Sequence, residues 1–126
     1  MASSLNTARL ALLASWPHIA LAAAAWLVVA ALMFLPDPQP IAVLDFTWGD
    51  KFAHFGVWCV LAMVTSRAFV PRRPWLAWVL CMGYGAAVEL IQLPIPGRGG
   101  ELGDAVADGL GAAVGVGLMM MWERRR

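Results

Sequence analysis

The chain has 126 residues and a net charge of +1, with 61% hydrophobic and 13% charged residues. Soluble domains carry about 25% charged residues, so this composition excludes an ordinary soluble domain and predicts a polytopic membrane protein. Only two cysteines occur, Cys59 and Cys81, and no basic stripe is interleaved with aromatic residues, which excludes a disulfide framework, a cysteine-based zinc site and a nucleic-acid-binding module.

Four apolar segments follow one another along the chain, separated by proline-containing or charged stretches. Their ranges are about 16–35, 52–70, 75–93 and 104–122. Each is ~19 residues long, close to the ~20 needed to cross a ~30 Å hydrocarbon core, and in lipid only a helix satisfies the backbone groups of such a segment. The sequence therefore predicts an all-α fold, a single domain over residues 1–126 with four transmembrane helices.

The first segment is expected to be a retained transmembrane helix rather than a cleaved signal peptide. Its apolar run is longer than the ~7–15 residues of a signal peptide's hydrophobic region, and Pro36-Asp37-Pro38 follows it where a cleavage site would need small residues. Ser15 is predicted to be the N-cap of this helix, with Pro17 in its first turn.

The basic residues predict the orientation of the four helices. Of nine Lys and Arg residues, Lys51 and Arg98 fall on one side of the membrane, so the other seven share the side of the two termini. The positive-inside rule therefore predicts that both termini are cytoplasmic. Tryptophans near the segment ends are expected to form interfacial belts, at positions Trp16, Trp48, Trp75, Trp78 and Trp122.

Polar and ionisable residues gather at the predicted extracytoplasmic ends of three helices. They comprise Asp50, Lys51 and His54, then Glu89 and Gln92, then Arg98 in the last connection, and finally Asp104 and Asp108. A rise of 1.5 Å per residue puts the helical members within about 6 Å of that boundary. Such residues usually face the protein interior or a wet cavity, so we expect one ligand-binding site formed by all eight.

The helical periodicity of the last segment places its carboxylates on a packing face. Asp104, Asp108, Gly111 and Gly115 fall within about 60° of one another around the helix, and Gly-x-x-x-Gly is the spacing that lets transmembrane helices approach closely. The carboxylates are therefore expected to point into the bundle rather than toward lipid.

The chemistry of this cluster has more than one interpretation. A histidine beside carboxylates can supply general acid–base catalysis, for which the candidates are His54, Glu89 and Asp104. Lys51 and Arg98 could hold an anionic headgroup. Each residue also has a structural interpretation: Asp104 as a helix cap, Lys51 as a membrane anchor, Glu89 as a brace. No H-E-x-x-H pair is present, so a metal site is disfavoured, and no cofactor is expected.

The sequence resembles the VanZ-like family. The signature D-K-x-x-H, E-x-x-Q, P-G-R, D-x-x-x-N, G-x-x-x-G is matched in order by Asp50-Lys51-x-x-His54, Glu89-x-x-Gln92, Pro96-Gly97-Arg98, Asp104 and Gly111-x-x-x-Gly115. Two departures occur: Asp108 stands where the family often has Asn, and Trp58 where it often has Tyr. The first suggests that this position requires a short hydrogen-bonding side chain rather than a negative charge.

The resemblance implies a small multi-pass protein of the bacterial inner membrane and cell envelope. The founding member of the family is associated with antibiotic resistance, as lowered susceptibility to the glycopeptide teicoplanin. The expected partners are the lipid bilayer together with a lipid-linked envelope precursor or a glycopeptide. Whether the protein forms a homo-oligomer is left open by the sequence. Two functions remain in competition at this point, a binding protein and a membrane enzyme that acts on a lipid-linked envelope intermediate.

Overall fold

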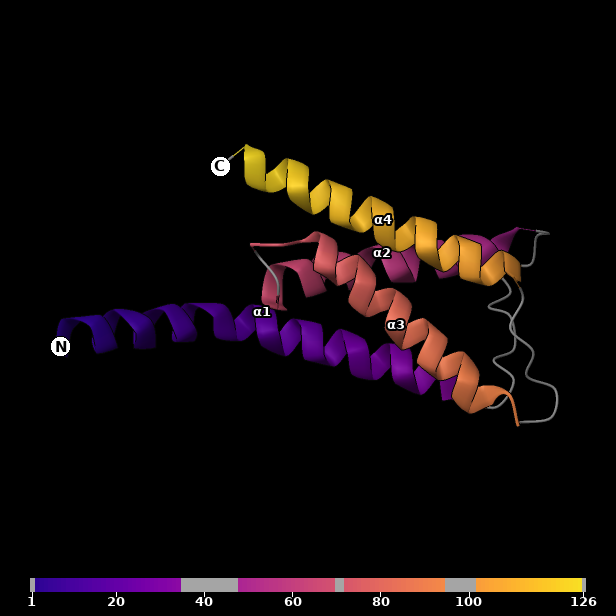
Figure 1. Cartoon of the computed structure of the whole chain (residues 1–126), viewed down its shortest axis with the longest axis horizontal. Coiled ribbons are helices and arrows are strands. Elements are labelled where there is room, and N and C mark those ends of the chain that lie inside the picture. The colour runs from indigo at the N-terminus through magenta and orange to yellow at the C-terminus, as the bar shows by residue number, and fades with distance from the viewer. Residues whose placement is uncertain (1, 35–47, 70–71, 95–101, 126) are drawn as a thin grey trace.

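The computed structural model contains four helices, and it describes residues 2–34, 48–69, 72–94 and 102–125. The helices are α1 (Ala2–Phe34), α2 (Gly49–Phe69), α3 (Trp75–Gln92) and α4 (Leu102–Arg124). No strand occurs in these ranges, so the predicted all-α fold is confirmed. Figure 1 shows the start of α1 and the end of α4 at one end of the bundle, and the ends of α1 and α3 with the starts of α2 and α4 at the other.

Every helix includes a stretch long and apolar enough to cross a membrane. These stretches are Ser15–Phe34, Lys51–Phe69, Trp75–Gln92 and Leu102–Arg124. Large apolar side chains cover the outside of the bundle, and the five tryptophans predicted to lie at the membrane boundaries are all exposed, between 41% and 65%. A surface this apolar is unfavourable in contact with water and favourable in contact with lipid. The chain is therefore a multi-pass membrane protein.

The start of α1 differs from the sequence prediction. The helix begins at Ala2, so Ser15 is not its N-cap, and Pro17 lies inside the helix. Proline removes one backbone hydrogen bond and crowds the preceding turn, but alanine and leucine dominate residues 8–14, and these are among the strongest helix formers. The helix therefore continues through the proline toward the N-terminus.

Helix α2 lies at the centre of the bundle, and α4 packs most closely against it. A Cβ atom added at Gly111 would overlap the Phe55 carbonyl, and one added at Gly115 would overlap the Cys59 carbonyl. Only glycine fits at such a backbone approach, so the predicted Gly-x-x-x-Gly contact is confirmed. We call this contact, with the residues on either side of it, the α2–α4 seam.

The core lies between α2 and the other three helices and is largely apolar. Trp58 and Leu61 are each 1% exposed. The Trp26 and Tyr84 rings meet edge to face with centroids 4.6 Å apart, and Trp26 Nε1 donates to Thr65 Oγ1 at 2.9 Å. This contact satisfies the indole N–H of α1 with a side chain of α2, which ties the two helices together in the bilayer interior.

Both cysteines belong to this packed interior. Cys81 is buried and Cys59 is half-buried, and both are free thiols. They are therefore unbridged small residues that contribute to packing.

Candidate functional site

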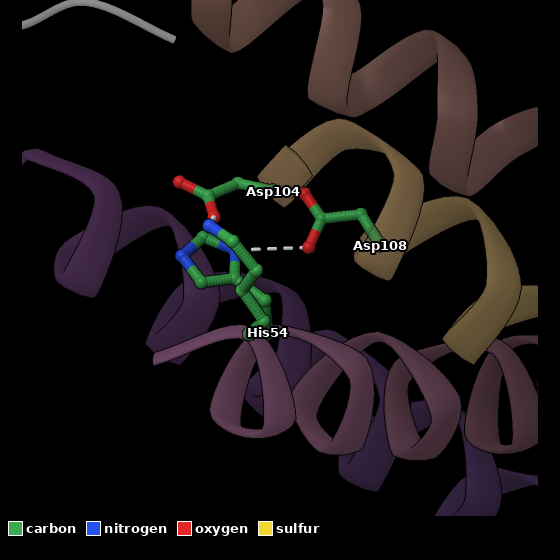
Figure 2. Close-up of polar contacts among 4 residues, drawn as sticks. His54, Asp104 and Asp108 are labelled. Atoms are coloured by element: carbon green, nitrogen blue, oxygen red, sulfur yellow. Dashed lines mark hydrogen bonds and ion pairs between the residues drawn. The ribbon is translucent and has the colours of Figure 1, made fainter. Parts of the chain in front are cut away.

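Two polar pairs cross the α2–α4 seam at the end of the bundle opposite the termini. Lys51 Nζ donates to Asp104 Oδ1 at 2.8 Å, and His54 Nδ1 lies 2.9 Å from Asp108 Oδ1. Figure 2 shows the His54 ring directed at the Asp108 carboxylate, with Asp104 beside it. We call these four residues the polar ladder.

The helix geometry explains why these residues meet. Lys51 and His54 are three positions apart on α2, and Asp104 and Asp108 are four apart on α4, so each pair shares a helix face. The same two faces continue along the chain into the glycine contacts with Phe55 and Cys59. Partners therefore follow one another in the same direction on both helices, which makes α2 and α4 parallel. The close glycine approach holds them in the register that pairs the polar residues.

The polar ladder is half-buried, so it belongs neither to the dry core nor to the open surface. The side chains of Lys51 and Asp104 are 28% and 22% exposed, and those of His54 and Asp108 are 26% and 16% exposed. Gly103 contributes to this arrangement, because a Cβ atom there would lie 2.9 Å from Lys51 Cε. The missing side chain leaves room for the lysine to lie over the start of α4.

The charge of Asp104 is favourable at the start of its helix, whereas the charge of Lys51 is unfavourable at the start of its own. The first turn of α4 favours a carboxylate such as Asp104, because the free N–H groups of a helix N-terminus carry partial positive charge. The first turn of α2 disfavours the cation of Lys51 for the same reason. The ion pair with Asp104 offsets this cost. Because α4 begins at Leu102, Asp104 lies within the first turn and is not the N-cap residue that the structural interpretation proposed.

The polar residues of α3 do not join the polar ladder. Glu89 is exposed, and in the described part of the chain no side chain forms a hydrogen bond or ion pair with it. Gln92 Nε2 instead donates to the Met33 carbonyl. That carbonyl belongs to the last turn of α1, where backbone acceptors lack partners within the helix. Gln92 therefore joins the ends of α3 and α1.

Two predicted site residues cannot be compared with the structure. The side chain of Asp50 and the whole of Arg98 lie outside the described residues. Their assignment to the ligand-binding site stays a prediction, as does that of Glu89 and Gln92.

Sequence reasoning missed two polar groups in the core. Trp58 Nε1 and Tyr84 Oη are buried and have no hydrogen-bond partner in the described ranges, although their rings lie 6.1 Å apart. Trp58 is one of the two departures from the family signature, and this departure was the only feature of the sequence that pointed to an unusual residue at this position. In the same ranges, no group of three or more His, Cys, Asp or Glu residues could hold a metal ion.

The polar ladder can perform two kinds of chemistry. A carboxylate that accepts a hydrogen bond from histidine Nδ1 fixes the orientation and tautomer of the ring, which prepares the histidine for proton transfer. A lysine and a histidine held beside two carboxylates can equally recognise a headgroup that carries both negative charge and hydrogen-bond donors. Both uses require that the four side chains be accessible, and each of them is partly exposed.

In the described residues, four helices able to cross a membrane and a polar ladder at one end of them define a small multi-pass membrane protein. The chain belongs to the VanZ/LLP1 family, whose profile matches residues 18–123. The resemblance seen in the sequence is thereby confirmed. Comparison with curated proteins and with solved structures finds no significant match.

Proposed function

We propose that this protein is a binding protein of the bacterial inner membrane, and that its polar ladder takes the polar head of an envelope component or of a glycopeptide at the extracytoplasmic surface. The observation that carries the proposal is the pairing of Lys51 with Asp104 and of His54 with Asp108, half-buried at the end of the bundle opposite the termini. Family membership supports a role in the cell envelope and in the response to glycopeptides.

The internal pairing favours binding over a purely structural role. Recognition of a headgroup requires that the paired side chains can be reached from outside the bundle, whereas a pair that only joins two helices has no such requirement. These pairs keep 16–28% of each side chain exposed. An anionic headgroup can therefore reach Lys51 and compete with the Asp104 carboxylate, while the two helices hold Lys51 and His54 in place. A site ordered before binding loses little conformational entropy when the ligand arrives.

The competing function is a membrane enzyme, and the 2.9 Å contact between His54 Nδ1 and Asp108 favours it. In this alternative, His54 moves a proton on a lipid-linked envelope intermediate. No hydroxyl nucleophile accompanies the histidine within the described residues. Thr65 and Ser66, on the same helix, are buried near its other end, about 17 Å or more from His54 at 1.5 Å per residue.

Binding measurements on the purified protein in nanodiscs test the proposal. The probes are a polyprenyl diphosphate and teicoplanin, added separately. We expect one of them to bind, and we expect Lys51→Met to weaken that binding about tenfold or more, because a charge-assisted contact is lost. Arg72→Gln is the matched control, since it removes a positive charge at the other end of the bundle. Equal binding by wild type and Lys51→Met, or no binding of either probe, would refute the binding function.

The same samples separate the enzyme from the binding protein. Mass spectrometry after long incubation detects any product of the polyprenyl diphosphate. Product formation that His54→Gln abolishes while probe binding persists would replace the binding function with the enzymatic one.

The orientation is tested independently. Gly99→Cys in a background without Cys59 and Cys81 should react with a membrane-impermeant thiol reagent in intact spheroplasts, because the basic residues favour cytoplasmic termini. Labelling that requires permeabilised cells would reverse the orientation.

A further inference from the structure

A cavity of about 160 Å³ is lined by residues of α1, α2 and α4. One of them, Arg67, belongs to the last turn of α2, at the end of the bundle where α4 also ends (Figure 1). The lining residues of the cavity are His18, Leu21, Met63, Val64, Arg67 and Met119. Arg67 follows His54 by thirteen positions on α2, which is about 20 Å at 1.5 Å per residue. The cavity is therefore separate from the polar ladder, and the proposed function makes no use of it.

The walls of the cavity are hydrocarbon. Leu21, Met63, Val64 and Met119 provide four of the six lining side chains, and methionine adapts readily to an irregular apolar partner. Leu21 is 58% exposed, so the cavity opens onto the outside of the bundle. An apolar cavity of about 150 Å³ accepts a benzene-sized hydrocarbon. In a bilayer, the hydrocarbon that meets such an opening is a lipid acyl chain.

The rim of the cavity carries two nitrogen-rich side chains from different helices. His18 belongs to α1, and Arg67 belongs to the last turn of α2 and is exposed. The planar guanidinium group donates two parallel hydrogen bonds to a phosphate, and the imidazole adds a further N–H donor. A phosphate held by these two groups would sit at the membrane boundary, with its acyl chain leading into the apolar walls.

The charge of this end of the bundle favours an anionic lipid. Among the described residues here, the basic ones outnumber the single acidic residue Glu123, and they are Arg67, Arg72, Arg73, Arg124 and Arg125. Basic clusters beside transmembrane helices attract anionic headgroups and do not attract neutral ones. The apolar walls, the hydrogen-bond donors of His18 and Arg67 and the surrounding positive charge therefore all favour an anionic lipid.

We propose that this cavity binds one anionic phospholipid from the leaflet at the terminal end of the bundle. One acyl chain packs against Leu21 and Met63, and the headgroup phosphate is held by Arg67 with His18 beside it. The bound lipid fills the space between α1 and its neighbours near the termini.

Native mass spectrometry of the delipidated full chain tests the proposal. The probes are phosphatidylglycerol and phosphatidylcholine with identical acyl chains, together with glycerol phosphate as a headgroup without chains. We expect one tightly held phosphatidylglycerol, with phosphatidylcholine about tenfold weaker and glycerol phosphate unable to compete. Arg67→Gln should remove the preference for phosphatidylglycerol, whereas Arg72→Gln, a matched loss of charge outside the cavity, should keep it.

A second variant tests the acyl-chain part of the site. Leu21→Trp fills the opening from an exposed position, so folding should be preserved, and it should weaken both lipids. Equal affinity for the two lipids, equal loss in Arg67→Gln and Arg72→Gln, or unchanged binding in Leu21→Trp would each overturn the proposal. So would effective competition by glycerol phosphate, which would indicate a phosphate site without an acyl chain. Dimers that Leu21→Trp disrupts, without lipid retention, would assign the cavity to a second copy of the chain.

Discussion

The α2–α4 seam and the C-terminal end of α3 both carry residues of the family signature, but the two regions use them differently. In the seam, glycines bring two backbones together, and the polar side chains pair across the contact at 2.8 and 2.9 Å. On α3, Glu89 stays exposed, and Gln92 binds a backbone carbonyl of α1. The comparison shows that one signature can combine residues that pair across two helices, a residue that joins the ends of two other helices and a residue that stays exposed.

The largest expected effect comes from breaking the seam itself. Gly111→Leu places a side chain where the Phe55 carbonyl lies, so α2 and α4 must separate and the register of the polar ladder is lost. We expect a decrease of about 3 kcal/mol in the free energy of unfolding, at the upper end of typical overpacking costs. Reversible unfolding in mixed detergent micelles measures it.

Gly117→Ala is the matched control on the same helix. A Cβ atom added there meets nothing within 4 Å. Alanine favours a helix over glycine by about 1 kcal/mol, so this variant should be neutral or slightly more stable. Similar destabilisation by Gly111→Leu and Gly117→Ala would show that helix α4 tolerates no change at all, and that the seam has no special role.

Much of the fold followed from the sequence because its physical causes are local. Hydrophobic length fixes each spanning helix, and the proline-containing breaks fix the ends of the first three to within a few residues. The start of α1 was missed because the helix propensity of the preceding residues outweighs the local effect of Pro17. The glycine spacing on α4 predicted a packing face, which the structure confirms.

The pairing within the site did not follow from the sequence, because it depends on how two helices are placed along and around their axes. Periodicity put Asp104 and Asp108 on one face, but it could not identify Lys51 and His54 as their respective partners. Which residues pair depends on the register of α2 against α4, and the backbone contacts of Gly111 and Gly115 set that register. Periodicity also could not show that Glu89 stays exposed, since this depends on the rotation of α3 against the bundle.

The next largest effect is expected at Asp108, within the ladder. Asp108→Leu removes the acceptor that faces His54 Nδ1 at 2.9 Å and should cost about 1–1.5 kcal/mol, near the upper end of the net contribution of one hydrogen bond. Asp108→Asn keeps an acceptor oxygen of the same reach and should change stability by less than ~0.5 kcal/mol. Unfolding free energies of the two variants decide the matter. Comparable losses would show that the negative charge itself is required, against the inference from the family's asparagine.

A variant of Asp104 compares the two pairs of the polar ladder, Lys51 with Asp104 and His54 with Asp108. Its carboxylate pairs with the fixed positive charge of Lys51 at 2.8 Å, so Asp104→Asn loses charge as well as a hydrogen bond. We expect a cost of up to ~1 kcal/mol, because the pair is partly exposed and screened by solvent. The cost should shrink in high salt, whereas the cost of Asp108→Leu should not. A salt-independent loss in Asp104→Asn would show that its hydrogen bond matters more than its charge.

The smallest effect on stability is expected for Glu89→Gln, and this makes it the most informative variant of α3. The side chain is exposed and has no partner among the described residues, so losing its charge should change the unfolding free energy by less than ~0.5 kcal/mol. If Glu89 contributes to ligand binding, as the signature predicts, the same variant should weaken binding of the probe that the polar ladder recognises by about tenfold, the loss expected for a charge-assisted contact. Membrane abundance, unfolding and probe binding are measured on one preparation, with Asp104→Asn as the reference for a residue that affects both properties. Loss of both stability and binding would show that Glu89 is a structural residue. Loss of neither would show that Glu89 does not belong to the site.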